Sequence, residues 1–156
     1  METPEISLEQ HKQFAIELFN STWDMLEKAD RSEYDDVRMI HMAHTSLYHW
    51  SYVGEAINMI RGEWQISRVY CSVGLLESAE YHANKTLSIC LNNNIGDIDL
   101  AFAYEAFTRI YALKLHQEDF NKYQALAFEA SKQITSINNR DYFIGELEKI
   151  QVKQSP

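Results

Sequence analysis

The sequence has 156 residues, 46% of them hydrophobic, and its 23 acidic and 14 basic residues give a formal net charge of −9. This length suits one domain, and the apolar content is enough for a core and too high for a disordered chain. The acidic balance argues against nucleic acid and anionic membranes as partners. No apolar run is long enough to span a bilayer, and the start METPEISLEQHKQ lacks a signal-peptide pattern, so we expect a cytoplasmic protein.

Apolar spacing predicts about seven helices, and the absence of sustained alternating runs argues against strands. Ser7 and Gln10 resemble a capping box at the start of the first helix. Gly74 is expected to end the third helix, and Asp97 to cap the fifth. The two prolines, Pro4 and Pro156, lie at the chain ends and interrupt no helix. The expected helices are 7–28, 34–53, 56–73, 76–92, 98–115, 118–134 and 140–150. The predicted fold is all-α, built from antiparallel helix pairs.

Helices of similar length joined by short turns call for a repeat search. A small residue followed by Tyr occurs twice at offsets typical of tetratricopeptide repeats, and in the first case Gly and Ala follow at the expected positions. The matching residues are Ser67, Tyr70, Gly74 and Ala79 in SRVYCSVGLLESAEYHA, then Thr108 and Tyr111 in FTRIYALKLHQEDFNKY. The two tyrosines are 41 residues apart, against about 34 in the ideal repeat. Neither repeat has its closing proline, the first-position tryptophan is absent, and the second lacks the alanine.

The chain therefore resembles the tetratricopeptide-repeat superfamily over about residues 56–134. The segments HWSYVG, RGEWQISRVY and GDIDLAFAYEAF also look like those of small bacterial proteins of this kind, a group without an assigned activity. The resemblance implies a single 1–156 domain forming a short superhelical array. Residues 7–54 would be a degenerate leading pair, 56–93 and 97–136 the repeat pairs, and 140–151 a capping helix.

In that superfamily the first helix of each pair lines a concave groove that holds a peptide or a partner protein. The groove positions implied here are Arg61, Trp64 and Arg68 on the third helix, and Phe102, Glu105 and Arg109 on the fifth. Arginine offers a planar fork of donors suited to a carboxylate, and aromatic rings offer flat apolar area. The opposite, core-facing stripe of the third helix would contain Met59, Gly62, Ile66, Val69, Tyr70 and Val73. In the alternative interpretation, the arginines pair with Glu105 and other local acids, and Trp64 packs beneath a cation.

Three histidines in RMIHMAHTSLYHW invite a metal-binding interpretation. On a helix, His44 falls within the packed stripe, His41 at its edge and His49 on the opposite side, so the three do not converge. His44 is expected to be a core residue bonded to Glu63, which falls in the core stripe of the next helix. A buried pair of this kind would also suit acid–base chemistry, or half a metal site completed by His11 or His41.

Three functions follow from these patterns. The first is a protein- or peptide-binding module without a cofactor. The second is a metal-binding or acid–base enzyme centred on His44 and Glu63. The third is a self-associating scaffold such as a homodimer, because short repeat arrays expose their ends. Cys71 and Cys90 are expected on different helices and too far apart for a disulfide, which fits a reduced cytoplasmic protein.

Overall fold

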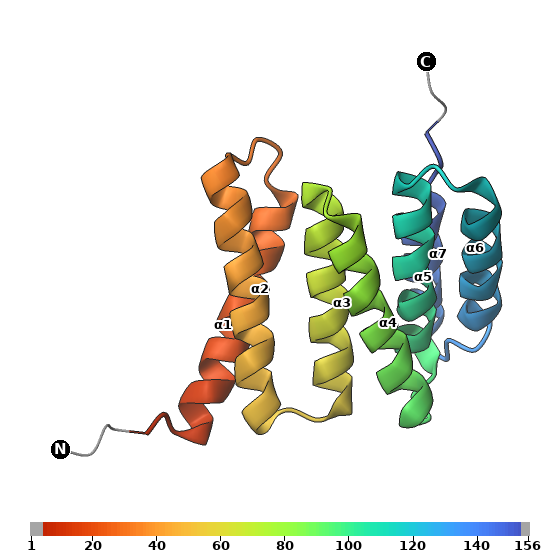
Figure 1. Ribbon diagram of the computed structural model, residues 1–156. Coiled ribbons are helices and arrows are strands. Elements are labelled where there is room, and N and C mark those ends of the chain that lie inside the picture. The colour runs from red at the N-terminus through yellow and green to blue at the C-terminus, as the bar shows by residue number, and fades with distance from the viewer. Residues whose placement is uncertain (1–4, 154–156) are drawn as a thin grey trace.

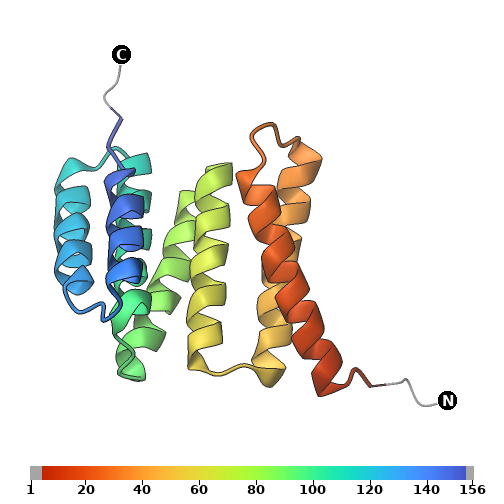
Figure 2. The ribbon, with the colours of Figure 1, turned by 180° about the vertical axis from the view of Figure 1, so that it is seen from behind.

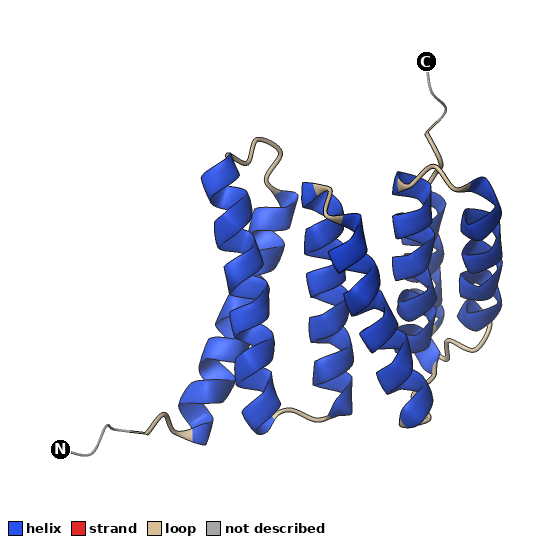
Figure 3. Cartoon of the chain, viewed as in Figure 1, coloured by secondary structure: helices blue, strands red, loops and turns tan. Residues whose placement is uncertain are grey.

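The computed structural model describes residues 5–153, and Figure 3 shows that this part of the chain consists of helices joined by short loops. The helices are α1 Leu8–Glu27, α2 Glu33–Val53, α3 Ala56–Val73, α4 Leu76–Asn92, α5 Asp97–Leu113, α6 Gln117–Ser131 and α7 Ile137–Glu148. The predicted all-α class is confirmed. Pro4, Pro156 and the two ends of the predicted 1–156 domain lie outside the described residues. Within residues 5–153, no helix is long and apolar enough to cross a membrane.

Local signals explain most helix ends. The capping box at Ser7 is confirmed, because its Oγ accepts from the Gln10 backbone N–H at 3.1 Å while the Gln10 side chain accepts from the Ser7 N–H at 2.9 Å. Gly74 ends α3 with a left-handed φ of 81°, a conformation that favours glycine. The predicted cap at Asp97 is wrong, since Gly96 occupies that position and Asp97 is the first residue of α5.

The predicted start of the last helix at Arg140 is also wrong. Helix α7 begins at Ile137, because the Ser136 hydroxyl accepts from the Asn139 N–H at 3.2 Å and caps the helix one turn earlier. Asn138 and Asn139 belong to the first turn of α7 and not to the loop that precedes it. Helix α6 ends at Ser131, earlier than the predicted residue 134.

The pairs α1–α2, α3–α4 and α5–α6 follow one another along the molecule, and α7 returns to lie beside α5 (Figure 1). Helices adjacent in sequence pack together, so that α1 lies on α2, α3 on α4, and α5 on α6. Seen from behind, α1, α3 and α7 face the viewer, with α5 directly beneath α7 (Figure 2). Helix α3 contacts both α1 and α5. One side of the stack is therefore built from α1, α3, α5 and α7.

Small residues allow the two helices of a pair to approach closely. The hydroxyl of Ser67 in α3 donates to the carbonyl of Ala79 in α4 at 2.8 Å, and both residues are buried. Gly62 is buried on the same helix, and a Cβ built there would lie 2.5 Å from Leu47 Cδ1 of α2. The predicted core stripe of α3 therefore faces its neighbours as expected.

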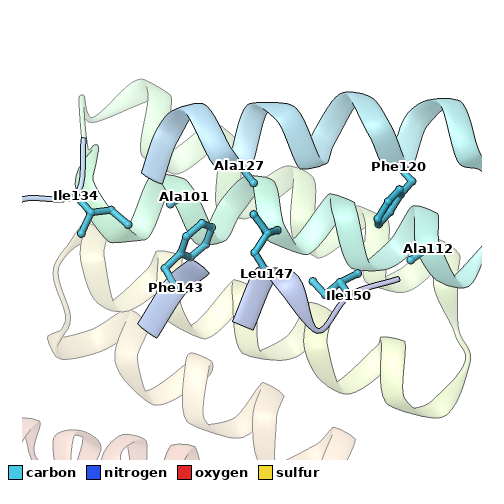
Figure 4. Packing of buried hydrophobic residues seen from close by; sticks show 8 residues of the cluster. All are labelled: Ala101, Ala112, Phe120, Ala127, Ile134, Phe143, Leu147 and Ile150. Carbon is cyan, nitrogen blue, oxygen red and sulfur yellow. The ribbon is translucent and has the colours of Figure 1, made fainter. Parts of the chain in front are cut away.

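A separate apolar cluster holds the C-terminal end of the stack together. Phe143 and Leu147 of α7 point toward buried residues of α5 and α6 (Figure 4). The cluster consists of Ala101, Ala112, Phe120, Ala127, Ile134, Phe143, Leu147 and Ile150. Since α7 contributes large buried side chains, it is an integral part of the core and completes the end of the stack.

Candidate binding groove

Three residues of α3 lie along one stripe of the helix, because Arg61, Trp64 and Arg68 are spaced three and four residues apart. The Arg61 side chain is 53% exposed, while Trp64 and Arg68 are partly buried. On the opposite, core-facing stripe, Ile66 and Val69 are buried against α2, and Met59, Tyr70 and Val73 are partly buried. The sequence therefore predicted the helical phase of α3 correctly.

Arg61 is held by an acid from α5. Its Nε and Nη2 donate to the two carboxylate oxygens of Asp99 at 2.9 and 3.2 Å, a two-pronged contact. Asp99 is not among the groove residues predicted from the sequence. It stands three residues before Phe102, so extending the predicted groove stripe of α5 by one turn would have found it.

Glu105 is the buried centre of a second network. The Trp64 indole N–H donates to Glu105 Oε2 at 3.0 Å, and Arg109 donates to Oε1 from Nε at 3.1 Å and from Nη2 at 2.5 Å. Glu105 has no exposed surface. The predicted alternative, in which the arginines pair with Glu105 and other local acids, describes both Arg109, which pairs with Glu105, and Arg61, which pairs with Asp99. Trp64 packs against the rings of Trp23 and Phe102, at centroid distances of 5.5 and 5.3 Å.

These rings belong to a row of neighbouring aromatic side chains, the aromatic arc, on the α1, α3, α5 and α7 side of the stack. The arc consists of Phe19, Trp23, Trp64, Phe102, Tyr142 and Phe143. Neighbouring rings lie 4.9 to 6.3 Å apart in tilted or edge-on contacts. The arc borders a cavity of about 230 Å³, which we call the aromatic pocket. The pocket is lined by Phe19, Trp23, Ile60, Arg61, Trp64, Ile98, Asp99, Phe102 and Tyr142. The sequence predicted three of these residues, Arg61, Trp64 and Phe102. It missed the others: Ile60, Ile98 and Asp99 of α3 and α5, Phe19 and Trp23 of α1, and Tyr142 of α7.

Arg68 lies in a narrow cleft next to the aromatic pocket. The cleft is lined by Trp64, Ser67, Arg68, Cys71, Glu105, Ala106 and Arg109. Trp64 borders both the cleft and the pocket, but the cleft is too tight to admit a water molecule. All six predicted groove residues thus line the pocket or the cleft on this side of the stack. Three arginines and two carboxylates leave this surface with an excess of one positive charge, on a chain whose net charge is −9.

The predicted pairing of His44 with Glu63 is wrong. His44 Nε2 shares a hydrogen bond of 2.8 Å with the Tyr70 hydroxyl, while His82 Nδ1 of α4 donates to Glu63 Oε2 at 2.6 Å. The rings of His44 and His82 are in edge-on contact at 5.3 Å. The four side chains form one partly buried polar cluster joining α2, α3 and α4. Burial lowers the pKa of His44, and the charge of His82 lowers it further.

His49 was expected to face away from the packed side of α2, and this is also wrong. It is buried against α1, where its Nδ1 and that of His11 share a hydrogen bond of 2.8 Å. Helix α2 packs on α1 with one face and on α3 with another, so its two buried faces cannot be described by one stripe. Burial lowers the pKa of His49.

The metal-binding and acid–base hypothesis concerns His44 and Glu63, which lie in one polar cluster without a hydrogen bond to each other. Within residues 5–153, no group of three His, Cys, Asp or Glu side chains is arranged to hold a metal ion. The main cavities are lined by residues other than His44 and Glu63. Cys71 and Cys90 are both free and buried, as predicted for cysteines on different helices.

Comparisons of this chain with protein-family models, with curated proteins and with solved structures find no match. The candidate site is therefore described by its own geometry: an aromatic pocket, next to the tightly packed Arg68, on the side of the stack formed by α1, α3, α5 and α7.

Proposed function

We propose that this protein is a tetratricopeptide-like binding module that holds an extended peptide segment of a partner protein against α1, α3, α5 and α7. The observation that carries the proposal is the aromatic pocket of about 230 Å³ on that side. Pockets for whole small molecules usually measure about 300 Å³ or more. A smaller volume, bordered by rings and aliphatic side chains, suits one or two apolar side chains of a peptide.

The repeat resemblance supports this proposal at two places. The buried Ser67 and Ala79 join α3 and α4 through the 2.8 Å hydrogen bond, at positions where tetratricopeptide repeats carry small residues. Tyr70 and Tyr111 occupy matching places on α3 and α5, and each donates or shares a hydrogen bond with a neighbouring helix. The groove residues of the superfamily then correspond to the stripe containing Arg61, Trp64 and Arg68.

Selection from a random peptide display library tests the proposal. Binding of a selected peptide is read from tryptophan fluorescence, because Trp23 and Trp64 border the pocket while Trp50 packs against the α2–α3 core. Two exposed tyrosines provide a matched pair of variants: Tyr142, 60% exposed, borders the pocket, whereas Tyr81, 58% exposed, lies on α4. We expect Tyr142→Ala to weaken binding several-fold and Tyr81→Ala to leave it unchanged.

Two results would count against the proposal. One is a selection that enriches no peptide above the level obtained with an unrelated protein. The other is a set of enriched peptides that bind Trp23→Ala and Tyr142→Ala as tightly as they bind the wild type. The second result would place the binding surface elsewhere on the molecule.

A further inference from the structure

His11 of α1 and His49 of α2 form a buried histidine pair that shares one hydrogen bond. Their Nδ1 atoms lie 2.8 Å apart, and the two residues are 6% and 8% exposed. One Nδ1 carries the proton and donates to the lone pair of the other, so the bond requires that at least one ring is neutral. When both rings are protonated, two N–H groups and two positive charges face each other, and the hydrogen bond is lost.

The aromatic rings around the histidine pair supply no negative charge. The ring of Tyr52 stacks on His11 at a centroid distance of 4.1 Å, and Phe14 and Tyr48 contact His49 at 5.2 and 5.6 Å. The Tyr52 and Tyr48 hydroxyls share a hydrogen bond of 3.0 Å. This bond raises the pKa of Tyr52 above the ordinary value of 10.0, so the ring that stacks on His11 is neutral in mildly acidic solution.

The charged residues near the pair do not compensate for a buried positive charge either. Glu9 and Lys12 flank His11 on α1, Glu55 follows the end of α2, and all three are exposed. Helix α3 also packs on α1, and it meets that helix with the neutral Gln65, whose Nε2 donates to the carbonyl of Phe19 at 2.9 Å.

Acids engage other histidines of the chain. Within residues 5–153, the histidines that form ion pairs are His82 and His116. Burial lowers the pKa of His49, and the charge of His11 lowers it further, with no acid to offset either effect. Protonation of the histidine pair therefore weakens the contact between α1 and α2 and creates no ion pair in its place.

Little else holds the N-terminal half of α1. Among residues 8–19, the buried ones are His11 and Ala15, whereas the apolar side chains of Phe14 and Ile16 are exposed. The other hydrogen bond to α2 in this half runs from Ser46 Oγ to the carbonyl of Ala15, at 2.7 Å. A segment that buries so few apolar side chains opens at a low cost in free energy.

This weakly held half of α1 leads directly into the aromatic pocket. Phe19 follows Ala15 by one turn and lines the pocket together with Trp23, whose ring it contacts at 6.3 Å. Further along α1, Met25 and Leu26 pack against the core between α2 and α3. The C-terminal end of α1 is therefore anchored, and release of its first turns leaves Phe19 at a free helix end.

We infer that the histidine pair makes the aromatic pocket pH-sensitive, because its protonation in mildly acidic solution releases the N-terminal half of α1 and removes the Phe19 wall. This inference rests on the proposed function, since it concerns the regulation of the same site. Histidines freed from the pair titrate at about pH 6.5, so a falling pH favours the released state. Binding at the pocket should be strongest at neutral pH and weaken in mildly acidic solution.

Native-state amide hydrogen exchange, followed by NMR, measures the release of α1 directly. The exchange rates of amides in α1 and α3 are each divided by the intrinsic rate at the same pH, between pH 7.5 and pH 5.5. Amides of α3 report global opening, which includes any effect of His44, and serve as the reference. We expect the protection of residues 12–19 relative to α3 to fall at least about tenfold, because a free histidine at pH 5.5 is protonated about ten times more often than not.

Variants of the histidines identify the groups responsible. The double variant His11→Gln/His49→Gln should lose most of the pH dependence, because two amides can share a hydrogen bond without titrating. His49→Gln alone should show a smaller change than the wild type, and it replaces the double variant if that does not fold. His116→Gln is the matched control, since it removes an exposed histidine that pairs with Asp119 on α6, and it should leave the exchange of α1 unchanged.

N-acetylphenylalanine amide is the binding probe, because it carries no charge over this pH interval. Its affinity is read from the indole NMR resonance of Trp64 at the pocket, with Trp50 as the internal reference. We expect the wild type to bind it several-fold more weakly at pH 5.5 than at pH 7.5. The double variant should bind it equally at the two pH values.

The outcomes separate the inference from the function on which it rests. Protection of α1 that stays constant relative to α3, or that falls equally in the double variant, overturns the inference and leaves peptide binding standing. Release of α1 with an unchanged affinity for the probe also overturns it, because the pocket is then not regulated. If the probe shifts the Trp64 resonance at neither pH at millimolar concentration, the proposed function fails and its regulation with it, whatever the exchange of α1 shows.

Discussion

The Trp64 indole donates a hydrogen bond to Glu105 Oε2 at 3.0 Å, joining α3 to α5 through a carboxylate that has no exposed surface. Arg109 neutralises the same carboxylate from one turn further along α5. Because both donors and the acceptor are shielded from solvent, this contact fixes how the central helices sit relative to one another. It also orients the Trp64 ring at the edge of the aromatic pocket.

Replacing Glu105 by glutamine should lower the free energy of unfolding by about 2–4 kcal/mol, since the mostly buried Arg109 loses its counter-charge. Urea denaturation measures the change. Glu129→Gln is the matched control. Glu129 is an exposed acid of α6 that pairs with Lys132, and its loss should change the free energy of unfolding by less than about 0.5 kcal/mol. Similar shifts in the two variants would show that the Glu105 network does not hold α3 to α5.

Gly62→Leu should destabilise the protein by about 1–3 kcal/mol, because a Cβ there would already lie 2.5 Å from Leu47 Cδ1 and a leucine would displace the Leu47 side chain from the packed α2–α3 contact. The comparison is Gly145→Leu on α7, where a Cβ meets no atom within 4 Å. The denaturation midpoints of both variants provide the test. An unchanged midpoint for Gly62→Leu would mean that α2 and α3 are not closely packed at this position.

His82→Ala should cost about 1–3 kcal/mol, because it leaves the partly buried Glu63 carboxylate without its 2.6 Å donor. His44→Ala should cost less, since its partner is the neutral Tyr70 hydroxyl rather than an acid. Thermal and urea unfolding of the two variants give the order. The reverse order would support the pairing of His44 with Glu63 that the sequence suggested.

Acidification from pH 7.5 to pH 5.5 should lower the free energy of unfolding. The pKa values of His44 and His49 are lowered in the folded protein from the ordinary 6.5, chiefly by burial and then by the charges of His82 and His11. As the pH falls, these two histidines are therefore protonated in the unfolded chain before they are protonated in the folded protein. Their contribution to the free energy of unfolding is complete above pH 6.5 and is lost as the pH falls toward their lowered pKa values in the folded protein. Glu63 opposes the shift at His44 without reversing it.

The variant His44→Gln/His49→Gln should show a flatter dependence of stability on pH over the same interval. Urea unfolding at closely spaced pH values gives the slopes. The interval ends above the usual range of carboxylate titration, which keeps acidic groups from contributing. Equal slopes for the wild type and the double variant would assign the pH dependence to other groups.

Neither thiol should react with a disulfide reagent in the folded protein at pH 8. Burial raises the pKa of Cys71 and of Cys90 to about 11, so the reactive thiolate is scarce as well as shielded. Both thiols should react at once when the protein is unfolded in urea. Immediate reaction of one thiol without denaturant would show that its helix opens readily, and single Cys→Ser variants would identify which one.

The sequence by itself determined the features that depend on contacts within a few residues. The capping box of Ser7 and Gln10 and the left-handed turn at Gly74 are local hydrogen-bond and backbone preferences, and both are present as predicted. The phase of α3 follows from the spacing of Ile66 and Val69, because a helix turns by a fixed angle per residue. That phase placed Arg61, Trp64 and Arg68 together on the opposite stripe.

Only the tertiary structure decided which side chains from different helices meet. Asp99 rather than Glu105 holds Arg61, and His82 rather than His44 holds Glu63. Periodicity gives the direction of a side chain around its own helix axis, but partner choice also depends on how far each helix slides along its neighbour and at what angle they cross. The same reason explains why the α1 and α7 walls of the aromatic pocket, which include Trp23, were not predicted.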